Sequence, residues 1–275
     1  MRRLVTIASI LVLGVVAGCG SGGYGDPEYE VISTQVAEVG ESTQDVWVWA
    51  PDAEGSWPVV YAVPGAGGDA RRDFEVFATE LAGQGVIVFA TNWRTISGST
   101  SDLEKDVECG YRASRATADE YGGDLSQPVT VVGFSMGATS VINLGVNEAT
   151  MGPGGRFSEC FTGEPRPEVI VALNGCHREA TFPAGVDTWG NNDARYILVS
   201  SDGDEVCSTE ETTHAETWLH NKGYDVEVVE IPGASHGELI FHDDTNREWA
   251  ELPNDHPPGR EAVQVVLDAI EAAQQ

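Results

Sequence analysis

The chain has 275 residues, and 44 acidic residues against 15 lysines and arginines give it a formal net charge of −29 at pH 7. Proteins bind nucleic acid through clusters of basic residues that contact phosphates. This chain has no such cluster, so its composition excludes a nucleic-acid partner. About 250 residues remain after a leader segment, which is enough to bury one core without division into two domains.

The N-terminus has the features of an export signal. Arg2 and Arg3 precede an apolar run over residues 4–17, which is too short to span a bilayer and is typical of a signal-peptide core. The run ends in Val16-Ala17-Gly18-Cys19, which resembles the lipobox of bacterial lipoproteins. The resemblance implies a signal peptide at 1–18, a lipid anchor at Cys19 and a tether over 19–29. The protein would then be exported and held at the bacterial cell surface or the periplasmic face of a membrane. An ordinary signal peptide with an incidental cysteine is the alternative.

Apolar runs and amphipathic segments alternate along the rest of the chain. Strands are expected over 30–39, 45–49, 59–63, 85–91, 128–132, 168–174, 196–200 and 225–231. Helices are expected over 69–84, 101–121, 138–146, 208–222 and 259–273. This alternation predicts an α/β fold, in which helices cover both faces of a mostly parallel central sheet.

The segment Gly133-Phe134-Ser135-Met136-Gly137 lies between a predicted strand and a predicted helix. The chain must turn sharply there, and glycine on each side avoids collisions with the neighbouring strand and helix. We therefore predict that Ser135 is presented as a nucleophile at the apex of the turn.

A serine hydroxyl becomes a good nucleophile when a histidine accepts its proton and a carboxylate orients that histidine. His236 follows the last predicted strand, and the acidic turn 201–206 follows the strand before it. Functional groups of open parallel sheets gather at the carboxyl ends of strands. We expect His236 to be the general base, with Asp204 or Asp202 as its carboxylate partner.

The order of serine, acid and histidine resembles that of the α/β-hydrolases over about residues 30 to 273, so residues 30–275 would form the catalytic domain. The family pattern of an aspartate followed closely by valine favours Asp204 over Asp202. The resemblance also implies an oxyanion hole, because Pro64-Gly65-Ala66 follows an early buried strand. Its two donors would be the backbone N–H groups of Ala66 and Met136.

Within this fold the chain is most similar to dienelactone-hydrolase-like esterases and cutinase-like polyester hydrolases. The latter share Ser-Met-Gly at the turn and Pro-Gly after the early strand. They carry an aromatic residue where this chain has Ala66, and another in the segment occupied here by 175–177. Dienelactone hydrolases use cysteine where this chain has Ser135. No large cap domain fits between the sixth and seventh strands, so we expect an open site.

The resemblance implies a carboxylic ester hydrolase that works through an acyl-enzyme, without a cofactor, on a small soluble ester or a polymer. We expect a monomer. A peptidase or acyltransferase of the same fold is one alternative, and a lipoprotein that only binds a ligand is another. Trp93 could form a substrate-facing wall or pack at a loop base. No metal is expected, because His214 and His220 are spaced so that they lie on different faces of their helix.

Four cysteines follow Cys19, at positions 109, 160, 176 and 207. An even number in an oxidising compartment suggests two disulfides, and four cysteines allow three pairings. Cys176 and Cys207 each follow one of two successive strands, which favours a Cys176–Cys207 bridge. The pair Cys109–Cys160 would remain.

Overall fold

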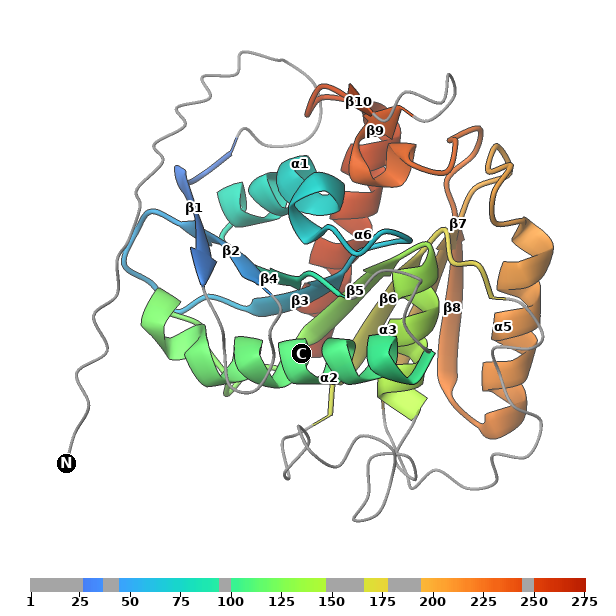
Figure 1. Ribbon diagram of the computed structural model, residues 1–275, viewed down its shortest axis with the longest axis horizontal. Helices are drawn as coiled ribbons and strands as arrows, with labels where there is room; N and C mark the ends of the chain where they lie inside the picture. Colours follow the sequence, from blue (N-terminus) through green and yellow to red (C-terminus); the bar gives the residue numbers. More distant parts are fainter. Residues whose placement is uncertain (1–26, 37–44, 94–99, 147–165, 178–193, 244–249) are drawn as a thin grey trace.

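An eight-stranded sheet runs through the protein (Figure 1) in the order β1-β2-β4-β3-β5-β6-β7-β8. The computed structural model describes residues 27–36, 45–93, 100–146, 166–177, 194–243 and 250–275. Its strands are β1 Val31–Val36, β2 Val46–Pro51, β3 Val59–Val63, β4 Ile87–Thr91, β5 Thr130–Phe134, β6 Val169–Leu173, β7 Arg195–Ser200 and β8 Asp225–Glu230. The pairs β1–β2 and β2–β4 are antiparallel, and every pairing from β4 to β8 is parallel. The predicted mostly parallel sheet is confirmed.

Helices cover both faces of this sheet (Figure 1). They are α1 Ala70–Gly83, α2 Thr100–Thr117, α3 Met136–Val146, α5 Thr209–Lys222 and α6 Pro257–Ala273. Apolar side chains of α1 and α6 share one buried cluster with one face of the strands. Side chains of α2, α3 and α5 share a second cluster with the opposite face. The site described below lies at the carboxyl ends of the parallel strands, between these two layers.

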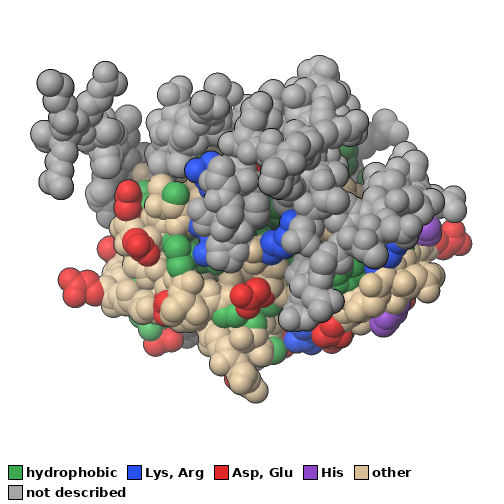
Figure 2. All heavy atoms as spheres, turned by 90° about the horizontal axis from the view of Figure 1, so that it is seen from below, with side chains coloured by type: hydrophobic (Ala, Val, Ile, Leu, Met, Phe, Trp, Pro, Cys, Tyr) green, Lys and Arg blue, Asp and Glu red, His purple; other side chains and the backbone are tan. Residues whose placement is uncertain are grey.

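The central strands are continuous apolar runs because both of their faces are covered. Every residue of β3, β4, β5 and β6 is buried. The edge strand β8 instead has only exposed and partly buried positions. Acidic side chains are spread over the described surface seen in Figure 2 rather than gathered in one patch.

Three local features differ from the sequence prediction. The predicted helix 101–121 ends as an α-helix at Thr117 and continues as a 3-10 turn, Ala118–Tyr121, which Gly122 closes in the left-handed conformation. A short ribbon of β9 His242–Asp243 and β10 Ala250–Glu251 was not predicted, because two-residue strands leave no periodic pattern. The helix expected from 138 begins two residues earlier, at Met136.

The leader 1–18, Cys19 and most of the tether 19–29 lie outside the described residues, so these predictions stay predictions. None of the helices in the described ranges has the length and apolar character needed to cross a membrane.

Candidate active site

Ser135 is the single residue between β5 and α3, and its backbone adopts a φ of 54°, in the left-handed region. The two flanking glycines make this turn sterically feasible. A Cβ on Gly133 would lie 2.4 Å from the Gly137 carbonyl oxygen, and a Cβ on Gly137 would lie 2.2 Å from the Val63 carbonyl oxygen. Both distances are far below a normal contact, so the turn requires glycine at both positions, as predicted.

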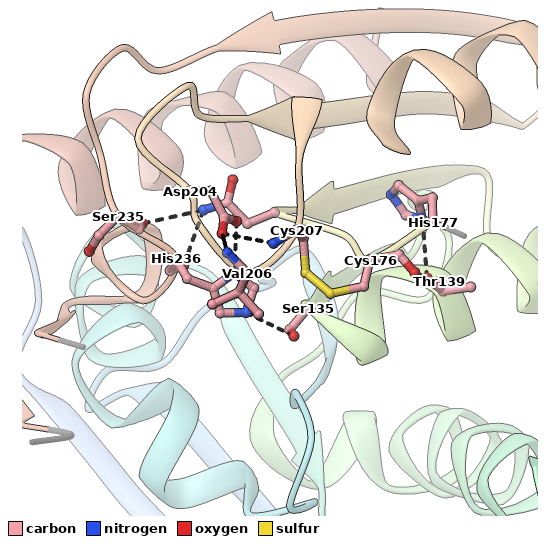
Figure 3. The surroundings of a disulfide bond; sticks show 10 residues. Ser135, Thr139, Cys176, His177, Asp204, Val206, Cys207, Ser235 and His236 are labelled. Carbon is pink, nitrogen blue, oxygen red and sulfur yellow. Dashed lines mark hydrogen bonds and ion pairs between the residues drawn. A yellow bond between two sulfur atoms is a disulfide. The ribbon is translucent and has the colours of Figure 1, made fainter. Parts of the chain in front are cut away.

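The predicted serine, histidine and acid lie in one hydrogen-bonded row (Figure 3). The Ser135 Oγ is 2.9 Å from His236 Nε2, and His236 Nδ1 is 2.7 Å from Asp204 Oδ2. All three residues are buried, with relative exposures of 5%, 6% and 8% for Ser135, His236 and Asp204. When Nδ1–H donates to Asp204, the tautomer leaves Nε2 as the acceptor for the serine hydroxyl. The arrangement can therefore activate an alcohol as a nucleophile.

The two aspartates of the acidic turn make different contacts. Asp204 turns one carboxylate oxygen toward His236, and its Oδ1 accepts hydrogen bonds from the backbone N–H groups of Val206 at 2.7 Å and Cys207 at 2.9 Å. Asp202 instead accepts from the Gly233 N–H at 2.6 Å and so ties the acidic turn to the loop before the histidine. Asp204, the favoured alternative, is thus the carboxylate beside the imidazole.

Asn174, which sequence reasoning missed, supports the histidine loop. It follows β6 directly, is buried, and has a φ of 41°, a conformation that asparagine tolerates better than most residues. Its side-chain N–H group donates to the carbonyl oxygens of His236 at 3.1 Å and Ser235 at 3.4 Å. A polar residue immediately after a wholly apolar strand was the available signal, but its partners lie about 60 positions further along the chain.

The loop Pro64–Gly68 lies against the serine, because a Cβ on Gly65 would be 3.1 Å from the Ser135 Cβ. Met136 is the first residue of α3, and the first N–H groups of a helix have no intrahelical acceptor. Among the described residues, no hydrogen-bond acceptor is found for the backbone N–H of Ala66 or of Met136. Both N–H groups are therefore available as donors beside the serine, and their assignment as an oxyanion hole remains a prediction.

Trp93 packs beneath this loop. Its side chain belongs to the buried core with an exposure of 4%, and its indole N–H donates to the Pro64 carbonyl oxygen at 3.0 Å. These contacts fit the second of the two alternatives, a packing tryptophan at a loop base. The substrate-facing wall stays a prediction.

A disulfide joins Cys176 to Cys207, as predicted (Figure 3). It connects the segment after β6 to the turn after β7, and the Cys207 N–H is one of the donors to Asp204. Two groups of described side chains combine residue types that can bind a metal ion. Each group includes Cys207, whose sulfur is part of this disulfide. Thiolates rather than disulfides bind metals. The Cys109–Cys160 pairing involves Cys160, which lies outside the described residues.

Reduction of this disulfide is expected to lower both stability and activity. The bond closes a loop with a sequence separation of 31, for which chain entropy gives a contribution of roughly 3 to 4 kcal/mol. Its loss also frees the backbone that donates to Asp204. Thermal melting and ester hydrolysis of a Cys176→Ala/Cys207→Ala variant should show a lower Tm and a lower kcat. Non-reducing peptide mapping that finds either cysteine free contradicts the pairing.

His177 lies beside the disulfide and is buried. Burial lowers the pKa of His177 to about 3, so its ring is neutral at pH 7. Its Nδ1 is 3.1 Å from the Thr139 hydroxyl of α3. The ring thus connects the segment after β6 to the helix that follows the serine.

Comparison with known proteins gives one sequence relative and several solved structures. No family model matches the chain. Gut esterase 1 of Caenorhabditis elegans is 27% identical over an alignment of 138 residues, which covers 45% of this chain and 24% of that protein. The chain therefore matches only about a quarter of that relative's length.

Among solved structures, esterase B of Lactobacillus rhamnosis, crystallised with a tributyrin phosphonate inhibitor, superposes with a TM-score of 0.69 and 14% identity over 89% of this chain and 86% of that one. A protein from Klebsiella pneumoniae that is provisionally named a dienelactone hydrolase superposes with a TM-score of 0.62 and 14% identity, over 88% of this chain and 98% of that one. An esterase of Pyrobaculum calidifontis superposes with a TM-score of 0.62 and 15% identity, over 90% of this chain and 86% of that one. With its parallel sheet covered on both faces, the chain has the α/β-hydrolase fold that these esterases and hydrolases share.

Proposed function

We propose that this protein is a serine carboxylic ester hydrolase that works through an acyl-enzyme. One observation carries the proposal: Ser135, His236 and Asp204 form a hydrogen-bonded row at the carboxyl ends of three parallel strands. The similarity to esterases supports ester substrates, because the relatives named above include three of them.

In the first half of the reaction, Ser135 Oγ attacks the ester carbonyl carbon, and His236 Nε2 accepts the serine proton. Asp204 stabilises the imidazolium that forms. The carbonyl oxygen becomes an oxyanion, which the N–H groups of Ala66 and Met136 would stabilise. Collapse of this intermediate breaks the bond to the leaving oxygen, and His236 returns its proton to that alkoxide.

In the second half, water attacks the acyl group on Ser135. His236 removes a proton from the water, and the second tetrahedral intermediate releases the carboxylic acid while the serine regains its proton. No step needs a further oxidant, reductant or cofactor. The buried row of side chains suits these reaction steps, because exclusion of water strengthens each charge interaction within the row.

The test is turnover of p-nitrophenyl esters of increasing acyl length by the purified protein, with a p-nitroanilide as the peptidase comparison. We expect release of p-nitrophenolate from the shorter esters and slower or no cleavage of the anilide. Cleavage of the anilide alone supports the peptidase alternative. Failure to turn over any ester, with binding retained, supports the non-catalytic alternative.

We further propose that the protein is exported and anchored by a lipid on Cys19, which the residues 16–19 support. Incorporation of labelled palmitate that persists in a Cys19→Ser variant contradicts this anchor.

A further inference from the structure

Hydrogen bonds to individual backbone N–H and C=O groups hold the loop Pro64–Gly68, and they define the orientation of its peptides. The Pro64 carbonyl accepts from the Trp93 indole, and the Gly65 carbonyl accepts from the Gly68 N–H at 3.1 Å. The Gly68 carbonyl accepts from the Trp93 backbone N–H at 3.1 Å. In a trans peptide the N–H points away from the preceding carbonyl, and no peptide among the described residues is cis. The Ala66 N–H is therefore directed opposite to the Gly65 carbonyl.

Two side chains of α1 complete these contacts. Asp73 Oδ2 accepts from the Gly65 N–H at 2.8 Å, and Asp73 Oδ1 accepts from Arg72 Nε at 2.8 Å. Arg72 Nη2 is 2.7 Å from the same carboxylate oxygen and 3.4 Å from the Ala66 carbonyl oxygen. The peptides before Gly65 and after Ala66 are thus tied to one helix, and the Ala66 N–H between them has no acceptor among the described residues.

The position of Asp73 is unusual for a carboxylate. Its relative exposure is 0%, on the face of α1 that also buries Phe74 and Phe77. A buried charge is costly unless it is paired and hydrogen-bonded, and an apolar residue would serve packing alone better. Burial raises the pKa of Asp73, while Arg72 and the Gly65 N–H oppose that rise. Burial of the Asp73 carboxylate therefore costs free energy, and the packing of α1 gives no reason for that cost. Its hydrogen bond to the loop beside Ser135 does give a reason.

We propose that Asp73, held by Arg72, is a positioning residue for the oxyanion donor: it fixes the Gly65 backbone so that the Ala66 N–H stays oriented for the transition state. This inference rests on the proposed ester hydrolysis. Asp73 itself does not touch the substrate, and its effect passes through Gly65 and Ala66. Loss of the acceptor lets the peptides beside Ala66 reorient, which weakens a contact that matters most in the transition state.

Two replacements of Asp73 separate this role from packing. Asp73→Leu keeps the branching and the number of side-chain heavy atoms but removes the acceptor, whereas Asp73→Asn keeps an oxygen for the Gly65 N–H. We expect Asp73→Leu to lower kcat about 10- to 100-fold with KM changed less than about threefold. Asp73→Asn should lose less than about tenfold. The inhibition constant of a trifluoromethyl ketone, whose serine adduct carries an oxyanion, should rise in proportion to the fall in kcat.

Asp69→Ala is the matched control. Asp69 caps the same helix by accepting from the Arg72 N–H, so its loss destabilises α1 without removing the bond to Gly65. We expect Asp69→Ala to lower Tm and to leave kcat within about twofold of the wild type. If Asp73→Leu does not fold, Arg72→Met, at a partly exposed side chain, is expected to lower kcat several-fold without a change in KM.

Wild-type kcat and wild-type ketone affinity in a folded Asp73→Leu, or in Arg72→Met where that variant replaces it, overturn the positioning role. Equal losses in Asp73→Leu, Asp73→Asn and Asp69→Ala indicate a purely structural effect and overturn it too. These outcomes are distinct from a failure of the proposed function, in which the wild-type protein itself turns over no ester.

Discussion

Replacement of Ser135 by alanine is expected to reduce kcat for a p-nitrophenyl ester by about 10⁴-fold or more, with the fold intact. The hydroxyl is the group that would form the acyl-enzyme, and His236 has no other alcohol at hydrogen-bond distance among the described residues. Alanine removes one buried oxygen and keeps the backbone turn. The measurement is steady-state hydrolysis with the melting curve of the same sample.

Ser140→Ala provides the control for this experiment. Ser140 lies on α3, the helix that follows Ser135. It is also buried, and its hydroxyl donates to the Met136 carbonyl oxygen rather than to His236 or Asp204. We expect its kcat to stay within about threefold of the wild type. Substantial turnover by Ser135→Ala, measured on protein free of contaminating esterase, contradicts the assignment of Ser135 as nucleophile.

Asp204→Asn is expected to lower kcat by about 10³- to 10⁴-fold, because an amide neither holds the imidazole in the required tautomer nor stabilises the imidazolium. The Asp204 carboxylate contacts the His236 ring and two backbone N–H groups. We therefore expect the substitution to lower activity more than it disturbs packing. Steady-state kinetics on the same ester measure this effect.

Asp202→Asn is the comparison that the acidic turn itself offers. Asp202 contacts the Gly233 N–H, and its amide analogue keeps an oxygen for that bond. A loss of less than about fivefold is expected. A larger loss in Asp202→Asn than in Asp204→Asn reverses the assignment of the acid.

Most of the fold was predictable because apolar runs and helical patterns are local properties of the chain. The strand 59–63 was predicted with the bounds that β3 has, since a buried parallel strand is a continuous apolar run between turn residues. Ser135, His236 and the acidic turn 201–206 were found in the same way, whereas the choice of Asp204 over Asp202 within that turn rested on the resemblance to the α/β-hydrolases. Each follows a strand, and parallel strands bring their carboxyl ends together even when the residues are far apart in sequence.

The supporting contacts were not predictable, because each depends on which side chain meets which backbone group across elements. Asn174 is recognised only once the loop of His236 lies over the end of β6. Asp73 looks like an ordinary charged residue of an amphipathic helix until its carboxylate is seen to accept from Gly65. Trp93 was ambiguous for the same reason, since its indole partner lies on another loop.

Labelling with a fluorophosphonate, followed by peptide mapping, tests the central claim most directly. Such a reagent reacts with a serine that a histidine activates, and its phosphonyl adduct remains on that oxygen. We predict one adduct per chain, on the peptide that contains Ser135, with slower labelling of Asp204→Asn and none of Ser135→Ala. An adduct on another residue, or an unlabelled protein that still hydrolyses esters, contradicts the account.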